Sequence, residues 1–357
     1  MRRVLRLFSL GSLLAALGFG SVLAEAGELA KVRAMFGSQS RAPSTVSPYS
    51  IAKKMGYFAE EGIEAEYLSS DGSVQATQLV SAGQAEYGVP SPEGTLNAAG
   101  RGTDLGTIYV YMAYRQPIFG LAVKPDSPVR SPRDLKGKTI GVASMGSSGV
   151  PAAKSMFREA GLDPEKDATF VAVGIGAVAG RALEDGRVDA LSLWDEQYAI
   201  LETLGIKFRE LPFTETYRKL FSAGILVRRE YLAKNRSQVV GFARAFAKAQ
   251  MFGMANPEAA VKINWEVFPE SKPKGVDEAR ALRDGTFVFK RRAAKWDPSL
   301  GGDSRMGAMT AEEWKAWVPF LGLEGKIDIA KYYTAELIDE INRFDRNKVL
   351  DQARTYR

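Results

Sequence analysis

Two short stretches of this chain, "GQAEYGVPSPE" at 83–93 and "GRVDALSLWDE" at 186–196, follow the same pattern. In each stretch a Gly ends an apolar segment of helical character, and an acidic residue, Glu86 or Asp189, follows shortly after it. A run suited to a β-strand comes next and closes on small, polar or aromatic residues and a Glu. The repetition predicts two similar halves, each built from a helix, a turn and a strand.

The similarity of the two halves extends beyond these stretches. "AKKMGYFAEEGI" in the first half parallels "AKSMFREAGL" in the second, and "MFGSQS" parallels "GVASMGSS". Periodicity predicts strands at 31–37, 64–70, 85–91, 105–114, 118–124, 138–144, 168–174, 187–194 and 222–228, and helices at 47–63, 71–83, 150–161 and 177–186. Strands that alternate with helices indicate an α/β fold with parallel-rich sheets flanked by helices.

Two features suggest how these elements are divided between domains. The segment "SPVRSPRDLKGK" (127–138) is punctuated by Pro, Gly and charge, which favours the entrance to a second lobe. After the return strand at 222–228 the chain is expected to be almost wholly helical, with one long amphipathic helix at 335–357. We expect these C-terminal helices to wrap the first lobe, and 357 residues are enough for two lobes.

The N-terminal residues 1–24 are expected to be a signal peptide. Three Arg residues precede an apolar run, and small residues follow it where a signal peptidase would cleave, near Ala24 or Ala26. A membrane anchor is the alternative, but Gly and Ser interrupt the run and it is barely long enough to span a bilayer. Because the chain has no Cys, a lipid anchor is excluded, and we expect a free periplasmic protein exported by the Sec or the twin-arginine route.

The composition disfavours most enzyme classes. The chain contains no His and no Cys, so a Ser-His-Asp triad and thiolate chemistry cannot occur. A zinc, copper or nickel site is disfavoured, because such sites rely heavily on imidazole or thiolate ligands. We therefore expect no catalytic residue, no metal and no cofactor. The formal net charge is +6, and basic residues mostly alternate with acidic ones. The basic segment "KRRAAK" (290–295) is expected to be a solvated helix face and not a nucleic-acid contact.

Candidate binding residues lie where the predicted strands end, because ligands of open parallel sheets bind beyond the carboxyl ends of the strands. This rule predicts ligand contacts at Ser38, Gln39, Ser91, Tyr114, Ser144, Ser147, Ser148, Trp194 and Asp195. "SMGSSG" (144–149) precedes a helix whose unpaired N–H groups favour an anion, but Ser147 and Ser148 can equally cap that helix. Asp195 can bind an amine or amide, or it can cap the helix that follows.

The expected ligand combines an oxyanion head with a flat or aliphatic body. Hydroxyls suit the oxyanion head. Tyr114 and Trp194 suit the body, because each ring can pack against a flat or aliphatic group while its polar tip makes a hydrogen bond. Sulfonates, aromatic carboxylates and pyrimidines fit this description. Phe119 is expected in the core and Arg115 in a surface turn. Without a Lys, or an Arg better placed than Arg115, an inorganic anion such as nitrate or bicarbonate is disfavoured.

Four segments carry a family resemblance: "SPRDLKGKTIGVAS", "GRVDALSLWDE", "IAKKMGYFAEEGIEAEY" and "LVSAGQAEYGV". They resemble the periplasmic solute-binding proteins of ABC importers, in the branch that serves nitrate, taurine, alkanesulfonates and thiamine-pyrimidine precursors. The resemblance spans residues 31–260. It implies a bilobed fold with lobe 1 at 27–122 plus 223–357, which includes a C-terminal helical cap, and lobe 2 at 123–222. It also implies a hinge of two crossings, near 120–126 and 218–226.

The resemblance implies a monomer that binds a small organic solute in the cleft and delivers it to a permease and ATPase in the inner membrane, with no nucleic-acid partner. By position, Ser38, Ser91, Ser147, Ser148 and Trp194 match cleft-lining places in such proteins. One alternative is a sensing module that reports to a membrane partner. Another is an enzyme like the fungal pyrimidine synthases, but their chemistry depends on a His and a Cys-rich segment, and this chain has neither.

Overall fold

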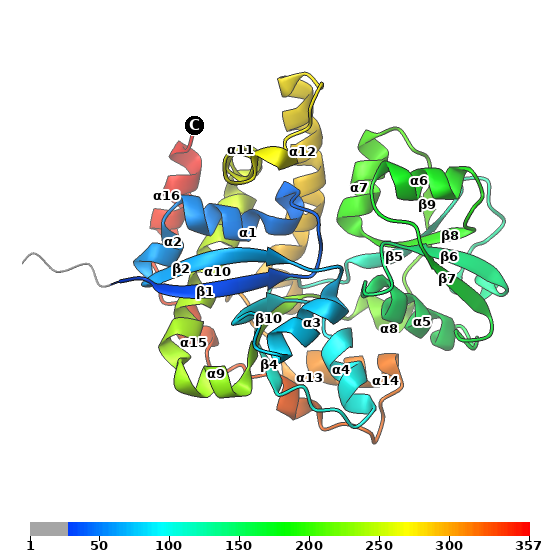
Figure 1. Cartoon of the computed structure of the whole chain (residues 1–357), viewed down its shortest axis with the longest axis horizontal. Helices are drawn as coiled ribbons and strands as arrows, with labels where there is room; N and C mark the ends of the chain where they lie inside the picture. The colour runs from blue at the N-terminus through cyan, green and yellow to red at the C-terminus, as the bar shows by residue number, and fades with distance from the viewer. Residues whose placement is uncertain (1–27) are drawn as a thin grey trace, which may run out of the picture.

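The structure, a computed structural model, describes residues 28–357 and has two lobes, each built on a five-stranded sheet (Figure 1). The first sheet has the order β2-β1-β3-β10-β4 and comprises β1 (Ala30–Phe36), β2 (Ile63–Ser69), β3 (Tyr87–Val89), β4 (Thr107–Met112) and β10 (Gly224–Arg228). The second has the order β7-β6-β8-β5-β9 and comprises β5 (Phe119–Val123), β6 (Lys138–Val142), β7 (Ala168–Ala172), β8 (Ala190–Trp194) and β9 (Arg209–Glu210). The expected signal peptide, 1–24, lies outside the described residues.

Helices flank both sheets (Figure 1). In the first half of the chain, lobe 1 holds α1 (Pro43–Lys54), α2 (Tyr57–Glu60), α3 (Ser73–Ser81) and α4 (Glu93–Gly100). Lobe 2 holds α5 (Gly149–Glu159), α6 (Ala177–Glu184), α7 (Asp195–Thr203) and α8 (Glu215–Arg218). The C-terminal part adds α9 (Arg229–Lys234), α10 (Arg236–Ala255), α11 (Pro257–Val267), α12 (Glu278–Ala293), α13 (Ala311–Lys315), α14 (Trp317–Leu321), α15 (Ile338–Ile341) and α16 (Arg346–Thr355).

Short 3-10 helices lie at η1 (Pro132–Leu135), η2 (Pro269–Ser271), η3 (Ala294–Trp296), η4 (Pro298–Gly301) and η5 (Ile329–Tyr332). Within residues 28–357, none of the helices combines the length and the apolar character that a membrane crossing requires.

The two sheets have the same arrangement of strand directions. β1 pairs in parallel with β2 and β3, and β6 pairs in parallel with β7 and β8. The remaining pairs are antiparallel: β10 lies between β3 and β4, and β5 lies between β8 and β9. The predicted α/β fold is therefore confirmed. Each sheet is mixed because it takes in a strand that enters from the other lobe and runs against the parallel set.

The repeated acidic residue has the same task in both lobes. The Glu86 carboxylate accepts a hydrogen bond from the backbone N–H of Arg33 at 2.8 Å, and the Asp189 carboxylate accepts one from the backbone N–H of Thr139 at 2.8 Å. In return, the Glu86 N–H donates to the Arg33 carbonyl and the Asp189 N–H to the Thr139 carbonyl. The acid thus fixes the start of β3 beside β1 in lobe 1 and the start of β8 beside β6 in lobe 2, which explains why both stretches carry it.

Two predicted helices are divided in the structure. The helix predicted at 47–63 is interrupted at Gly56, whose φ of 76° lies in the left-handed region that Gly adopts without strain, so α1 and α2 are separate. The long helix predicted at 335–357 is also wrong, because α15 ends at Ile341 and α16 starts afresh. There the side chain of Asp345 caps the new helix by accepting a hydrogen bond from the backbone N–H of Lys348 at 3.1 Å.

The chain crosses between the lobes twice. Because β4 lies in the first sheet and β5 already lies in the second, the first crossing is at 113–118, ahead of the expected hinge at 120–126 and boundary at 122. The second crossing lies between α8 and β10, at 219–223. Arg115, expected in a surface turn, is instead buried in the first crossing. It donates to the Ala308 carbonyl at 2.6 Å and pairs with Glu313, which ties this crossing to the C-terminal part.

Most of the C-terminal helices pack on lobe 1, as expected, but α12 also packs on α7 and α14 on α5 of lobe 2. α10 lies against α1, and the rings of Tyr87 in β3 and Phe242 in α10 stack with centroids 3.8 Å apart. Trp314 is fully buried and stacks on Tyr333 with centroids 5.0 Å apart. Lobe 2 has in addition a smaller apolar cluster of its own that includes Leu191 of β8. The larger apolar cluster comprises lobe 1 and the C-terminal helices and continues into lobe 2 through residues such as Phe119 and Ile140.

Candidate interlobe binding site

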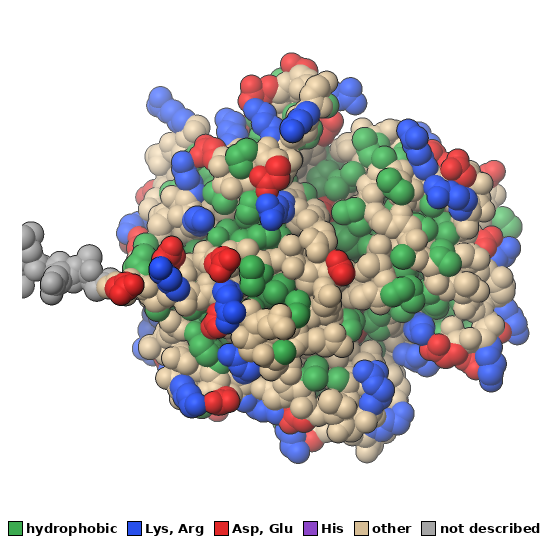
Figure 2. All heavy atoms as spheres, viewed as in Figure 1, with side chains coloured by type: hydrophobic (Ala, Val, Ile, Leu, Met, Phe, Trp, Pro, Cys, Tyr) green, Lys and Arg blue, Asp and Glu red, His purple; other side chains and the backbone are tan. Residues whose placement is uncertain are grey.

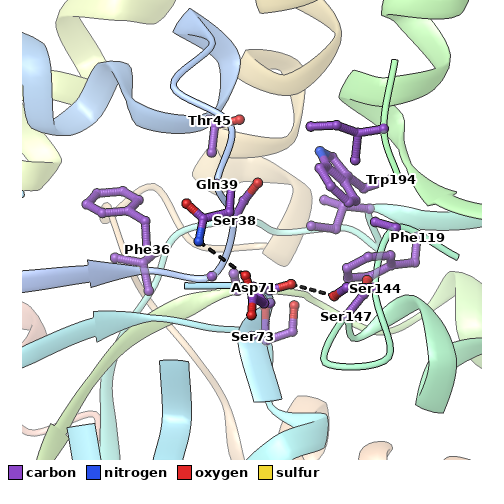
Figure 3. A pocket seen from close by; sticks show the side chains of 18 of the residues that line it. Phe36, Ser38, Gln39, Thr45, Asp71, Ser73, Phe119, Ser144, Ser147 and Trp194 are labelled. Carbon is purple, nitrogen blue, oxygen red and sulfur yellow. Dashed lines mark hydrogen bonds between the residues drawn. The ribbon is translucent and has the colours of Figure 1, made fainter. Parts of the chain in front are cut away.

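A cavity of about 230 Å³ lies between the lobes, at the carboxyl ends of the parallel strands. In Figure 3, Gln39 and Asp71 of lobe 1 lie opposite Phe119 and Trp194 of lobe 2. Hydrophobic side chains are visible in the recess between the two lobes in Figure 2. The lining comprises Phe36, Gly37, Ser38, Gln39, Thr45, Asp71, Gly72, Ser73, Val89, Ser91, Tyr114, Ile118, Phe119, Ala143, Ser144, Ser147, Gly174, Ile175, Trp194, Ala223 and Arg292.

Most of the residues singled out from the sequence come together at this cavity. Those that line it are Ser38, Gln39, Ser91, Tyr114, Ser144, Ser147 and Trp194. Ser148 and Asp195 do not line it, because each begins the next helix and is buried in the interlobe contact behind the wall. Ser148 caps α5 with its backbone only, since its side chain makes no capping hydrogen bond.

Phe119 was expected in the core, and it is both buried and part of the cavity wall. Its ring meets that of Trp194 edge-on, with centroids 6.1 Å apart and planes at 74°. Aromatic pairs favour this geometry because the positive edge of one ring meets the negative face of the other. The two rings come from the paired strands β5 and β8 and form a rigid apolar wall on the side of lobe 2.

Arg292 is the main residue that the sequence reasoning missed. It belongs to the basic segment 290–295, which was expected to be solvated, but only 3% of its side chain is exposed. Its Nε donates to Asp195 Oδ1 at 2.9 Å, and its Nη2 donates to the same oxygen. The guanidinium carbon lies 4.9 Å from the centroid of the Tyr114 ring. The expectation that the cleft has no well-placed Arg is therefore wrong.

The surroundings of Arg292 keep it charged. Burial acts to lower its pKa, but the charge of Asp195 acts in the opposite direction and the pKa is raised overall. The neighbouring basic residues also contact acidic residues of lobe 2. Arg291 pairs with Glu202 and Glu210, and the Lys295 Nζ lies 3.8 Å from Asp195 Oδ2. The basic segment of α12 and the residues after it thus join the C-terminal part to lobe 2.

Several hydrogen bonds close the cavity by joining the two lobes. The Ser144 hydroxyl donates to the Asp71 carbonyl at 2.6 Å, as drawn in Figure 3. The Ser40 hydroxyl donates to Glu196 Oε1 at 3.1 Å, and the Thr45 hydroxyl also donates to Glu196. Glu196 is fully buried and lies at the start of α7 in lobe 2, whereas Ser40 and Thr45 belong to lobe 1. The structure therefore has the lobes in a closed arrangement.

At Gly72 the two lobes approach each other closely. A Cβ atom at this position would overlap the carbonyl group of Gly146 in lobe 2. The backbone N–H of Val74 donates to the same carbonyl at 3.3 Å. A residue with a side chain at position 72 would keep the two loops apart, so the closed arrangement depends on this glycine.

Glu93 is a third buried acid at the lobe interface, after Asp195 and Glu196. It is the first residue of α4 and only 1% exposed, and burial raises the pKa of its carboxyl to about 8. The hydroxyl of Ser148 in lobe 2 opposes this shift only in part. Within residues 28–357, Glu93 Oε2 and Ser148 Oγ have no hydrogen-bond partner. Glu93 is therefore uncharged at neutral pH and adds no negative charge below the cavity.

The residues that line the cavity suit the binding of a small molecule. Its polar groups are mainly hydroxyls, together with the amide of Gln39, and its charged groups are Arg292 and Asp71. Asp71 is exposed at the mouth, where it accepts a hydrogen bond from the Gln39 amide at 3.2 Å. In the described part of the chain no three acidic side chains are grouped as metal ligands. Aromatic walls with a few placed polar groups are typical of small-molecule sites.

Comparisons with known proteins agree with this geometry. The family described as "NMT1/THI5 like" matches residues 44–260. Riboflavin-binding protein RibY of Chloroflexus aurantiacus is 24% identical over 299 residues, which cover 82% of this chain and 82% of that protein. The 4-amino-5-hydroxymethyl-2-methylpyrimidine phosphate synthase THI12 of Saccharomyces cerevisiae is 25% identical over 240 residues, which cover 64% of this chain and 67% of that protein.

Among solved structures, the alkanesulfonate-binding protein SsuA from Xanthomonas axonopodis pv. citri bound to MOPS is similar, with a TM-score of 0.63 and 21% identity. The match covers 86% of this chain and 99% of that one. The structural similarity shows the fold, and the family match covers more than half of the chain. The chain belongs to the NMT1/THI5-like family and has the two-lobed fold of the periplasmic solute-binding proteins of ABC importers.

Proposed function

We propose that this protein is the extracytoplasmic solute-binding component of an ABC uptake system. It would bind a small organic solute, a sulfonate, a carboxylate or a pyrimidine-like compound, in the interlobe cavity and deliver it to a permease and its ATPase in the inner membrane. The observation that carries the proposal is the cavity itself: residues of both lobes line it, and hydrogen bonds between the lobes close it. A ligand held by both lobes stabilises the closed state by its differential affinity.

The nine sequence-predicted residues divide into two groups in this proposal. Those that line the cavity contact the solute directly, with the aromatic rings of Tyr114 and Trp194 against its body and hydroxyls such as Ser147 at its polar end. Ser148 and Asp195 act one layer behind the wall, where Asp195 holds Arg292 in place. A periplasmic location, reached through cleavage of residues 1–24, and a monomeric state belong to the same proposal.

Neither alternative has comparable support. For an enzyme like the yeast synthase, the lining supplies no His and no Cys, and its carboxylate is the exposed Asp71. A sensing module would use the same cavity, so solute binding is the first property to test in either case. Binding to a purified permease complex then separates transport from sensing.

The test is a thermal melt of the chain from residue 25 onward, refolded to strip any carried solute. The panel holds taurine, longer alkanesulfonates, nitrate, aromatic carboxylates, aminopyrimidines and riboflavin. A solute at a hundred times its dissociation constant stabilises the native state by about 2.7 kcal/mol, which raises the melting temperature by a few degrees. A folded protein that responds to none of these compounds would contradict the proposal for these solute classes.

Two tryptophan variants make the test specific for the cavity. Trp194 lines the cavity and Trp265 lies in α11 outside it, and both are 8% exposed. Trp194→Ala is expected to abolish the shift that the active solute gives, because the ring wall is lost. Trp265→Ala is expected to lower the melting temperature of the free protein but to keep the shift. Equal loss of the shift in both variants would mean that the solute binds elsewhere or that the effect is global.

A further inference from the structure

The charges around Arg292 decide which kind of solute the cavity can accept. Arg292 reaches the cavity wall from α12, on the C-terminal side of the chain, while its carboxylate partner Asp195 starts α7 in lobe 2. Two of the three guanidinium nitrogens, Nε and Nη2, donate to the single oxygen Asp195 Oδ1. Within residues 28–357 the third nitrogen, Nη1, makes no hydrogen bond to Asp195, and Arg292 lines the cavity beside Tyr114. We infer that Nη1 is the nitrogen that serves a solute.

The net charge of this group of side chains is balanced. Arg292 and Lys295 supply two formal positive charges, and the buried carboxylates of Asp195 and Glu196 supply two negative ones. Both carboxylates act on Arg292, since each raises its pKa. Glu93 below the cavity is uncharged at neutral pH, and Asp71 at the mouth is a further acid. The cavity therefore has no excess of positive charge.

An anionic solute would lose its hydration in this cavity, and the positive charge of the guanidinium that it meets is already balanced by Asp195. Buried charges need a partner of opposite sign to offset desolvation. An uncharged acceptor, such as a carboxamide, a carbonyl or a ring nitrogen, needs only the hydrogen bond that Nη1 can donate. The aromatic wall of Phe119 and Trp194 then packs against the rest of the molecule.

We propose that Asp195 and Arg292 act together as the charge selector of the cleft, so that the site takes an uncharged polar solute in preference to the matching anion. The inference rests on the proposed solute-binding function and narrows it to one class. Asp195 is the positioning residue, and Arg292 is the residue that contacts the solute. The pair also joins lobe 2 to the C-terminal part, so the selection takes place in the closed arrangement.

The test uses pairs of compounds that differ in charge and little else: nicotinamide and nicotinate, ethanesulfonamide and ethanesulfonate, riboflavin and its 5′-phosphate. Dissociation constants are measured by calorimetry at pH 7.5 for the wild type, Asp195→Asn and Glu202→Gln. Glu202→Gln is the matched control, because it removes a lobe 2 carboxylate that pairs with Arg291 outside the cavity lining. Circular dichroism melts establish that each variant is folded.

In each pair that binds, the wild type and Glu202→Gln are expected to hold the uncharged member at least tenfold more tightly. In Asp195→Asn the guanidinium loses its carboxylate partner, so the anionic solute can pair with it instead. The ratio of the two dissociation constants is therefore expected to shift toward the anion by at least tenfold. A wild type that favours the anion, or an Asp195→Asn variant with an unchanged ratio, overturns the inference and leaves the proposed function standing.

A second measurement does not depend on an organic solute. Sodium nitrate, compared with sodium chloride of equal ionic strength, is expected to raise the melting temperature of Asp195→Asn and not that of the wild type or Glu202→Gln. If none of the six organic compounds binds the folded wild type, the proposed function fails for these solutes, and the nitrate response still decides the charge assignment. No response of Asp195→Asn to nitrate, or an equal response of the wild type, overturns it.

Discussion

Glu93→Gln isolates the energetic effect of a buried, uncharged acid at the lobe interface. The pKa of the Glu93 carboxyl is raised by burial from 4.5 to about 8. Between these two pH values the native state keeps a proton that the unfolded state has lost, so the free energy of unfolding falls as the pH rises through this window. Each pKa unit corresponds to about 1.4 kcal/mol, so the full decline is about 5 kcal/mol if the carboxyl stays buried.

Gln has the size of the protonated acid but cannot ionise, so the variant is expected to lack this decline. Urea unfolding, followed by tryptophan fluorescence at intervals from pH 5 to pH 8.5, measures the effect. The stability of Glu93→Gln relative to the wild type should increase by several kcal/mol across the series. Glu64→Gln, at an exposed position of β2, serves as the control and should follow the wild type at every pH. Parallel curves for Glu93→Gln and the wild type would refute the reasoning.

Three further predictions concern closure and packing. Gly72→Ala places a Cβ against the Gly146 carbonyl, so the variant should close less completely and bind the solute more weakly. Small-angle scattering with the solute present should show a more open molecule than the wild type, and equal compaction would contradict this. Trp314→Ala removes a fully buried ring and should cost about 3–5 kcal/mol in urea unfolding, and a cost below 1 kcal/mol would mean that the site collapses to fill the space. Glu86→Gln and Asp189→Asn replace the equivalent acids of the two lobes, and each should cost about 1 kcal/mol; a large cost in one lobe alone would contradict their equivalence.

The sequence could predict the elements and the lobes because their signals are local. A strand ends where small residues follow an apolar run, and parallel strands place their carboxyl ends at one edge, so Ser38, Ser91 and Ser147 could be grouped before their contacts were known. The same rule located Trp194 at the end of β8. The repeated acids at 86 and 189 marked two equivalent lobes, which have the same strand order and the same hydrogen bond.

Arg292 could not be located in this way, because its position depends on how α12 packs against α7, far away in the sequence. By pattern alone, a basic segment on an amphipathic helix is typical of a solvated face. The missed break at Gly56 has a different cause: apolar residues continue with helical spacing on both sides, and only the left-handed backbone of this residue separates the two helices. Phe119 illustrates a third limit, since packing in the core and lining a cavity require the same kind of side chain.

The placement of β10 between β3 and β4 has a consequence for synthesis and folding. Lobe 2 is a contiguous insertion, so all of its strands have been synthesised once residue 210 is made. The first sheet, in contrast, lacks a central strand until residues 224–228 follow, and its core also requires helices near the C-terminus. Pairings between distant segments form slowly, so lobe 2 should fold first and lobe 1 should complete its sheet last. Truncation after residue 222 would therefore leave one lobe with all its strands and the other with a gap in the middle of its sheet.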